Sequence, residues 1–167
     1  MKHLCLALLA CLAPACATDD LELGEETQAT TGSGTASKLL GSGIYSGDIH
    51  LDRDLGDWDL KLKTKGDTRV AVQTIDFAAG GQSGWHSHPG PVFITVVKGT
   101  MTFYDSHDPT CTPIVRTAGQ GFLDGGGEDA HIARNETGEP AQNLVVYLAP
   151  TTGPLRIDAP NPGTCAF

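Results

Sequence analysis

The sequence predicts an all-β protein, and three observations support this prediction. Its 167 residues include 21 Gly and 10 Pro, more than helices tolerate, and these residues favour short strands joined by turns. Segments of alternating or continuous apolar character recur at short spacing, separated by turn residues such as Lys65-Gly66-Asp67 and Lys98-Gly99. No window of the sequence carries the apolar stripe of 3.6-residue period that is typical of an amphipathic helix.

Residues 1–15 are predicted to be a signal peptide. A basic start precedes an apolar run from Leu4 to Leu12, which is far shorter than the roughly 20 residues that cross a bilayer. Two processing sites remain open. Cys16, directly after Ala13-Pro14-Ala15, resembles a bacterial lipoprotein site, at which Cys16 would be lipidated, while the same small residues also suit ordinary cleavage and free secretion. Either reading predicts export from the bacterial cytoplasm to the periplasm, the cell envelope or the medium.

Residues 16–38 are expected to form a disordered tether. This segment is acidic, rich in Thr, Ser and Gly, and almost without large apolar residues, so it cannot bury enough surface to offset the entropy of ordering. The folded domain is therefore predicted to occupy residues 39–167, including a C-terminal tail.

The domain should contain about ten strands. They are expected at 43–51, 58–65, 68–78, 93–97, 100–105, 112–118, 121–124, 131–136, 143–149 and 155–159. Many short strands in one domain suggest a sandwich or a barrel, and a jelly roll or full closure would protect the strand edges.

Two cysteines remain in the expected domain after Cys5 and Cys11 leave with the signal peptide. Cys111 and Cys165 are expected to form a disulfide in an oxidising compartment, closing a loop of more than fifty residues. On the chain-entropy model such a bridge stabilises the fold by roughly 4 kcal/mol. The alternative is two free thiols.

The charge of the chain narrows the class of partner. A formal net charge of −9, from 20 acidic and 11 basic residues, excludes a phosphate-backbone binder because such proteins cluster Lys and Arg. The expected partner is a small molecule, with membrane attachment only through the possible lipid at Cys16.

Three histidines are candidate metal ligands. His86 and His88 are two residues apart, so on a strand both side chains leave the same face. His131 lies in a later strand and could join them only if the two strands are neighbours. The segment Pro89-Gly90-Pro91 predicts a rigid corner directly after His88.

Around these histidines the chain resembles the cupin superfamily of small jelly-roll barrels. Gly80, His86, His88 and Gly99 occupy positions of the first cupin motif, and His131 with Asn135 matches the second. The resemblance covers roughly residues 44–159 and implies a single barrel, a bound divalent transition metal (Fe, Zn, Mn or Ni) and, as in many cupins, a possible homodimer.

The chain departs from the cupin pattern at two places. Val92 stands where the first motif has a metal-binding glutamate, and Gly126 and Glu128 replace the proline and glycine of the second motif. The implied shell is therefore three histidines without a carboxylate, similar to that of three-histidine iron dioxygenases. Gln82 is a candidate for an additional oxygen ligand.

Other residues near the motifs are expected to have less specific roles. Asp124, Glu128 and Asp129 flank the approach to His131 and could accept hydrogen bonds or act as a base, although acidic residues in a glycine loop are usually solvated. His50 and His107 are expected at the surface. The expected wall of the pocket consists of Trp85, Phe93, Met101, Phe103 and Tyr147.

These observations leave several functions open. The leading prediction is an exported cupin that binds a divalent metal and a small molecule, and that could act as a metal-dependent dioxygenase. The main alternative is a non-catalytic metal- or ligand-binding module of the cell envelope. A barrel without metal, or sugar isomerase chemistry, is a weaker alternative.

Overall fold

The structure, a computed structural model, describes residues 29–167. The predicted signal peptide, the possible lipidation of Cys16 and most of the predicted tether lie outside the described residues. Among residues 29–167 there is no helix of the length and apolar character that a membrane crossing requires.

The described chain consists of strands and turns, which confirms the all-β prediction. The strands are β1 (Ser33–Tyr45), β2 (His50–Asp54), β3 (Asp59–Lys63), β4 (Thr68–Gln82), β5 (His86–Ser87), β6 (Val92–Lys98), β7 (Thr100–Asp105), β8 (Ile114–Thr117), β9 (Gly121–Asp124), β10 (His131–Arg134), β11 (Ala141–Pro150) and β12 (Ile157–Asp158).

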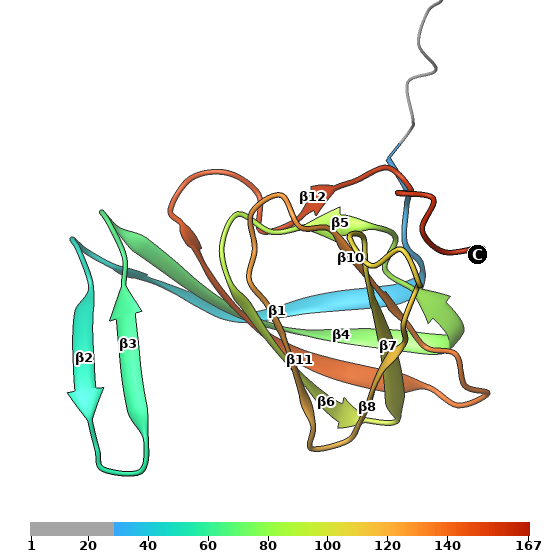
Figure 1. Cartoon of the computed structure of the whole chain (residues 1–167), viewed down its shortest axis with the longest axis horizontal. Helices are drawn as coiled ribbons and strands as arrows, with labels where there is room; N and C mark the ends of the chain where they lie inside the picture. Colours follow the sequence, from blue (N-terminus) through green and yellow to red (C-terminus); the bar gives the residue numbers. More distant parts are fainter. Residues whose placement is uncertain (1–28) are drawn as a thin grey trace, which may run out of the picture.

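Ten of these strands form one antiparallel sheet that curls into a nearly closed barrel (Figure 1). Hydrogen-bonded neighbours follow the order β12-β5-β10-β4-β11-β6-β9, with β1 added to β4 and β8 joined through β7 to β10. The long strand β4 makes the curl possible. It pairs with β1 and β11 along most of its length, and its last residue, Gln82, pairs with Arg134 of β10.

The first strand starts earlier than the sequence predicted. β1 begins at Ser33, and the backbone N–H of Thr30 already donates to the Ala159 carbonyl. The predicted boundary at residue 38 therefore falls inside a strand. Small, polar residues predict a tether in this segment. β1 is nevertheless ordered without apolar residues, because β4 pairs with its backbone from Thr35 to Tyr45.

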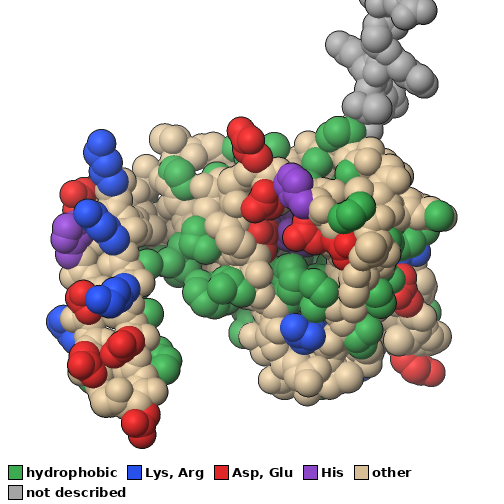
Figure 2. Space-filling model, viewed as in Figure 1, with side chains coloured by type: hydrophobic (Ala, Val, Ile, Leu, Met, Phe, Trp, Pro, Cys, Tyr) green, Lys and Arg blue, Asp and Glu red, His purple; other side chains and the backbone are tan. Residues whose placement is uncertain are grey.

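The hairpin β2–β3 stands clear of the barrel (Figure 1). It extends the β1–β4 ribbon beyond the pair Tyr45–Thr68. Charged side chains gather on it (Figure 2), among them Lys61, whose Nζ lies 3.2 Å from an Asp52 carboxylate oxygen on the facing strand.

The barrel has two apolar clusters. The larger one fills the interior between the sheet walls and includes Phe77, Val92, Met101 and Phe103. The smaller one contains Trp85, Tyr104, Ile132 and Cys165. Cys165 forms a disulfide with Cys111, as predicted, and thereby fixes the C-terminal tail against the loop between β7 and β8.

Candidate metal centre

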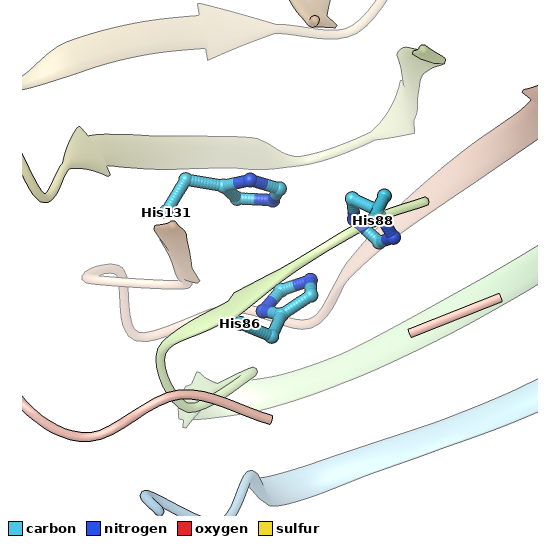
Figure 3. Close-up of side chains that lie close together, drawn as sticks. All are labelled: His86, His88 and His131. Atoms are coloured by element: carbon cyan, nitrogen blue, oxygen red, sulfur yellow. The ribbon is translucent and has the colours of Figure 1, made fainter. Parts of the chain in front are cut away.

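The three predicted histidines converge in the barrel (Figure 3). Residue His131 of β10 pairs directly with His86 of β5, so their side chains lie on the same face of adjacent strands. One ring nitrogen from each of His86, His88 and His131 lies within 4.8 Å of the others, and all three side chains are buried. The ring centroids of His86 and His131 are 4.4 Å apart.

Both ends of the described chain hold the strand that carries His86. Thr30 Oγ1 accepts a hydrogen bond from the Trp85 backbone N–H at 2.6 Å, and the Ala159 N–H donates to the Trp85 carbonyl at 2.9 Å. The Trp85 side chain, 2 % exposed, anchors this position in the smaller apolar cluster. The residue before His86 is therefore fixed on both sides of the backbone.

Backbone carbonyls orient two of the imidazoles. His86 Nδ1 lies 2.9 Å from the Gly84 carbonyl oxygen, and His88 Nδ1 lies 2.7 Å from the Leu155 carbonyl oxygen. An acceptor at Nδ1 places the proton on that nitrogen and leaves the lone pair on Nε2. Metal-binding histidines are commonly oriented in this way.

Burial keeps these histidines uncharged. Burial, together with the nearby His131 and Arg156, lowers the pKa of His86 to about 2. Burial also lowers the pKa of His88 to about 4, against the hydrogen bond to Leu155, which raises it. At neutral pH both side chains are therefore neutral imidazoles, the form that binds metal.

A buried carboxylate lies beside the histidines. Asp124, the last residue of β9, is 6 % exposed, and its Oδ2 lies 3.0 Å from His131 Nδ1 and 3.7 Å from His88 Nε2. Burial raises the pKa of Asp124, but contacts with His131 and the Gly126 N–H outweigh it, so that pKa lies below its usual value. The expectation of a site without a carboxylate is therefore incomplete, because a carboxylate comes from a strand outside the first motif.

Two glycines bring the loop after Asp124 against the predicted corner. Gly126 has a φ of +74°, and a Cβ there would lie 2.4 Å from Gly90. A Cβ on Gly90 would lie 2.3 Å from the Leu148 carbonyl oxygen. The Gly127 N–H donates to the His88 carbonyl at 2.7 Å, which ties this loop to a candidate metal ligand. The glycines of the loop thus replace the usual turn residues of the second motif by allowing close backbone packing.

The histidines border a cavity of about 470 Å³. Its lining is mixed, with apolar Ile75, Phe77 and Val145 and polar Gln73, Asn143 and Tyr147. Residues of β1, including Thr35 and Ser37, form one side, and Arg156 and Asp158 of the tail form another. A volume of this size is in the range of small-molecule sites.

The donor set fits a divalent transition metal. Three imidazoles that share one pocket suit Zn, Fe or Ni, and a carboxylate in contact with two of them reduces the net charge of a bound dication. Asp124 Oδ2 and His131 Nδ1 are both buried and face each other at 3.0 Å. A bound cation would compensate the buried charge of this carboxylate.

Gln82, the candidate additional ligand, is engaged elsewhere. Its Nε2 donates to the Thr31 carbonyl at 3.1 Å, and its Oε1 accepts from the Gly84 N–H. The amide therefore ties the N-terminal segment to the turn before His86. Asn135 of the second motif is also structural, because its Nδ2 donates to the carbonyls of Ala78 and Glu139 at 2.9 and 2.7 Å.

The predicted pocket wall is mostly wrong. Of the five residues proposed, only Tyr147 lines the cavity. Phe93 is 50 % exposed because alternation along β6 points Val92 and Ile94 inward instead. Met101 and Phe103 belong to the larger apolar cluster, and Trp85 belongs to the smaller one.

The surface assignments hold for four of the residues, since His50, His107, Glu128 and Asp129 are exposed. Of the three acids that flank the approach to His131, Asp124 alone is buried. Its position in the segment Gly-Phe-Leu-Asp was the available signal, since strand alternation puts Asp124 and Phe122 on the same face.

Comparisons with known proteins yield matches among solved structures. No protein-family profile and no curated protein matches the sequence. A conserved protein from Klebsiella pneumoniae with a double-stranded β-helix domain is 22 % identical, over 54 % of this chain and 74 % of that protein, with a TM-score of 0.46. The cupin domain of a transcriptional regulator from Enterobacter cloacae is 17 % identical, over 72 % and 100 %, with a TM-score of 0.43. A polyketide cyclase from Streptomyces resistomycificus is 19 % identical, over 56 % and 64 %, with a TM-score of 0.45.

These likenesses concern the barrel alone. The curled antiparallel sheet and the direct pairing of His131 with His86 bring the residues of both predicted motifs to one place. This barrel and the convergence of the three histidines agree with the single barrel that the resemblance implies.

Proposed function

We propose that this protein binds one divalent transition metal through His86, His88 and His131, and a small polar molecule in the adjoining cavity. The observation that carries the proposal is the shared orientation of His86 and His88. In each of them Nδ1 is hydrogen-bonded to a backbone carbonyl, so the lone pair of Nε2 is available to a metal. His131 completes the cluster. The Nε2 atoms of these buried imidazoles have lost their hydrogen bonds to water, and a bound metal would compensate this loss.

The residues around the cluster would select and orient the small molecule. Arg156 lines the cavity together with Asp158, with which it forms an ion pair, and its positive charge lowers the pKa values of His86 and His88. An anionic group of the small molecule would compete with Asp158 for this guanidinium. Tyr147 and Gln73 hydrogen-bond to each other across the lining and offer polar contacts. If the bound metal is redox-active, it would supply oxygen-dependent oxidation of the molecule held there.

Metal content tests the first half of the proposal. Protein purified without a histidine tag is expected to contain about one equivalent of a divalent transition metal, and the double variant His86→Ala/His88→Ala is expected to contain almost none. The matched control His50→Gln/His107→Gln removes two exposed histidines and should retain the metal. Equal metal content in the protein and in the His86/His88 variant would refute the proposal.

Oxygen uptake tests the second half. Iron-loaded protein is assayed with a panel of thiols, 1,3-diketones and small carboxylic acids. Oxygen uptake that disappears in the His86→Ala/His88→Ala variant, with both oxygen atoms recovered in the product, would establish a dioxygenase. Metal binding without oxygen uptake across this panel would instead support a non-catalytic binding module.

We also propose that the protein is exported. The disulfide between Cys111 and Cys165 supports an oxidising compartment, because such bridges rarely persist in the cytoplasm. Cell fractionation combined with mass spectrometry of the mature N-terminus tests this. An N-terminus at residue 16 carrying lipid would identify a lipoprotein, whereas intact residues 1–15 in the cytoplasmic fraction would overturn the proposal.

A further inference from the structure

We infer that Asp124 is a fourth ligand of the metal. Its carboxylate would replace that of the first-motif glutamate, whose position Val92 occupies in this chain. The inference rests on the proposed metal-binding function. It adds a residue from β9 to a site that the sequence assigned to β5, the residue His88 that follows it, and β10.

The strand register supports this replacement. Val92 of β6 pairs directly with Asp124 of β9, so the two side chains lie next to each other on the same face of the sheet. Val92 is fully buried. A carboxylate at position 124 therefore lies in the same region of the barrel as a carboxylate at position 92 would, but it comes from the neighbouring strand.

The distances around Asp124 fit a shared ion. Ligand atoms that lie about 2.0–2.2 Å from one metal are roughly 3–3.5 Å from each other. Asp124 Oδ2 is 3.0 Å from His131 Nδ1 and 3.7 Å from His88 Nε2. Since His88 Nδ1 is bonded to the Leu155 carbonyl, Nε2 is the nitrogen that His88 offers to a metal.

The two oxygens of Asp124 are used differently. Oδ1 accepts a hydrogen bond from the Gly126 N–H at 2.9 Å, which fixes the carboxylate in place. Oδ2 is buried and faces His131 Nδ1 and His88 Nε2, at 3.0 and 3.7 Å. A buried carboxylate is costly unless positive charge compensates it, so its position beside three histidines points to a cation that it binds.

The loop holds the Asp124 carboxylate rigidly. Gly126 packs against Gly90 at a distance that no Cβ could occupy, and the Gly127 N–H donates to the His88 carbonyl. The position of Asp124 is thus coupled to the backbone of a histidine ligand. Rigid support of this kind is what a metal ligand on a loop needs.

Cobalt binding tests the inference, because Co²⁺ reports its ligands through visible absorption. The purified protein, with its disulfide intact and its native metal removed, is titrated with Co²⁺ and compared with Asp124→Asn. This substitution keeps the shape of the side chain and removes its charge. Glu128→Gln removes an equal charge from an exposed position in the same loop and serves as the control.

We expect Asp124→Asn to bind Co²⁺ about 100-fold more weakly or worse, with a changed absorption spectrum, and Glu128→Gln to match the parent. An unchanged spectrum in Asp124→Asn would overturn the inference, whatever the affinity, because it would place Asp124 outside the ligand set. Failure of the parent protein itself to bind Co²⁺ would overturn the proposed function, and the inference with it. Thermal unfolding of each metal-free variant verifies that it is folded.

Discussion

The barrel interior and the hairpin β2–β3 are built from the same alternation of apolar and polar residues, yet only the barrel buries its apolar side. Along β6, Val92 and Val96 are fully buried. On the hairpin, Leu51 and Leu62 face each other across the two strands, but Leu55 and Trp58 near its tip are 64 % and 58 % exposed.

The difference lies in what faces each sheet. The inward residues of β6 meet the opposite wall of the barrel, which excludes water from both sides. Within the described chain no second layer covers the hairpin, and a two-stranded hairpin alone is marginally stable in water. Alternation therefore shows which residues share a face of a strand. Whether that face is buried depends on whether another layer of the protein packs against it.

The two tryptophans of the chain give the largest expected contrast between these regions. Trp85→Ala should lower the free energy of unfolding by about 3–5 kcal/mol, because it leaves a cavity in the smaller apolar cluster. Trp58→Ala on the hairpin should change it by less than about 0.5 kcal/mol. Urea unfolding of both variants measures the difference. Similar losses in the two variants would mean that the hairpin is buried in solution.

Acid sensitivity of the metal-free protein gives the second contrast. The pKa values of His86 and His88 are lowered in the folded state to about 2 and about 4, so the unfolded chain binds more protons as soon as the pH falls below its ordinary histidine pKa. Stability should therefore fall with decreasing pH from about 6.5, by at most about 1.4 kcal/mol per pH unit for each histidine.

Exposed His50 of the hairpin supplies the control for this experiment. Urea unfolding between pH 7 and pH 5 should show a reduced slope in His88→Gln, whereas His50→Gln should follow the parent. A parent stability that is constant over this range would contradict the lowered pKa values of the buried pair.

The sequence predicted the parts of this site that depend on local spacing. His86 and His88 stand two residues apart beside a Pro-Gly-Pro corner, and the match of His131 to the second motif placed it on a neighbouring strand. The disulfide between Cys111 and Cys165 follows from counting cysteines in a chain that is predicted to be exported. The homodimer suggested by the resemblance stays a prediction.

What the sequence did not predict depends on pairing between distant strands. Asp124 becomes part of the site only because β9 pairs with β6 in a register that sets it beside Val92. The composition of the first residues of β1 predicts a tether, because the order of this strand comes from backbone pairing with β4, which leaves no trace in composition. The prediction that Phe93 points inward is wrong because the alternation of β6 defines two faces without showing which one faces the interior.

The smallest expected contrast is between Tyr147, which lines the cavity, and Tyr45, which is exposed on β1. Gln73 Nε2 donates a hydrogen bond to the Tyr147 hydroxyl, and burial raises the pKa of Tyr147 to about 12, so the hydroxyl stays neutral. Tyr147→Phe leaves the Gln73 amide without this partner and should cost about 1 kcal/mol of unfolding free energy. Tyr45→Phe, on exposed β1, should cost nothing measurable.

Metal binding separates the polar role of Tyr147 from its packing role. The Tyr147 ring centroid lies 5.5 Å from that of His88, and phenylalanine preserves this contact. Co²⁺ affinity in Tyr147→Phe should therefore match the parent while stability falls. If affinity falls as well, the hydroxyl acts on the histidines through the cavity, and the lining of the cavity is then part of the centre rather than a wall beside it.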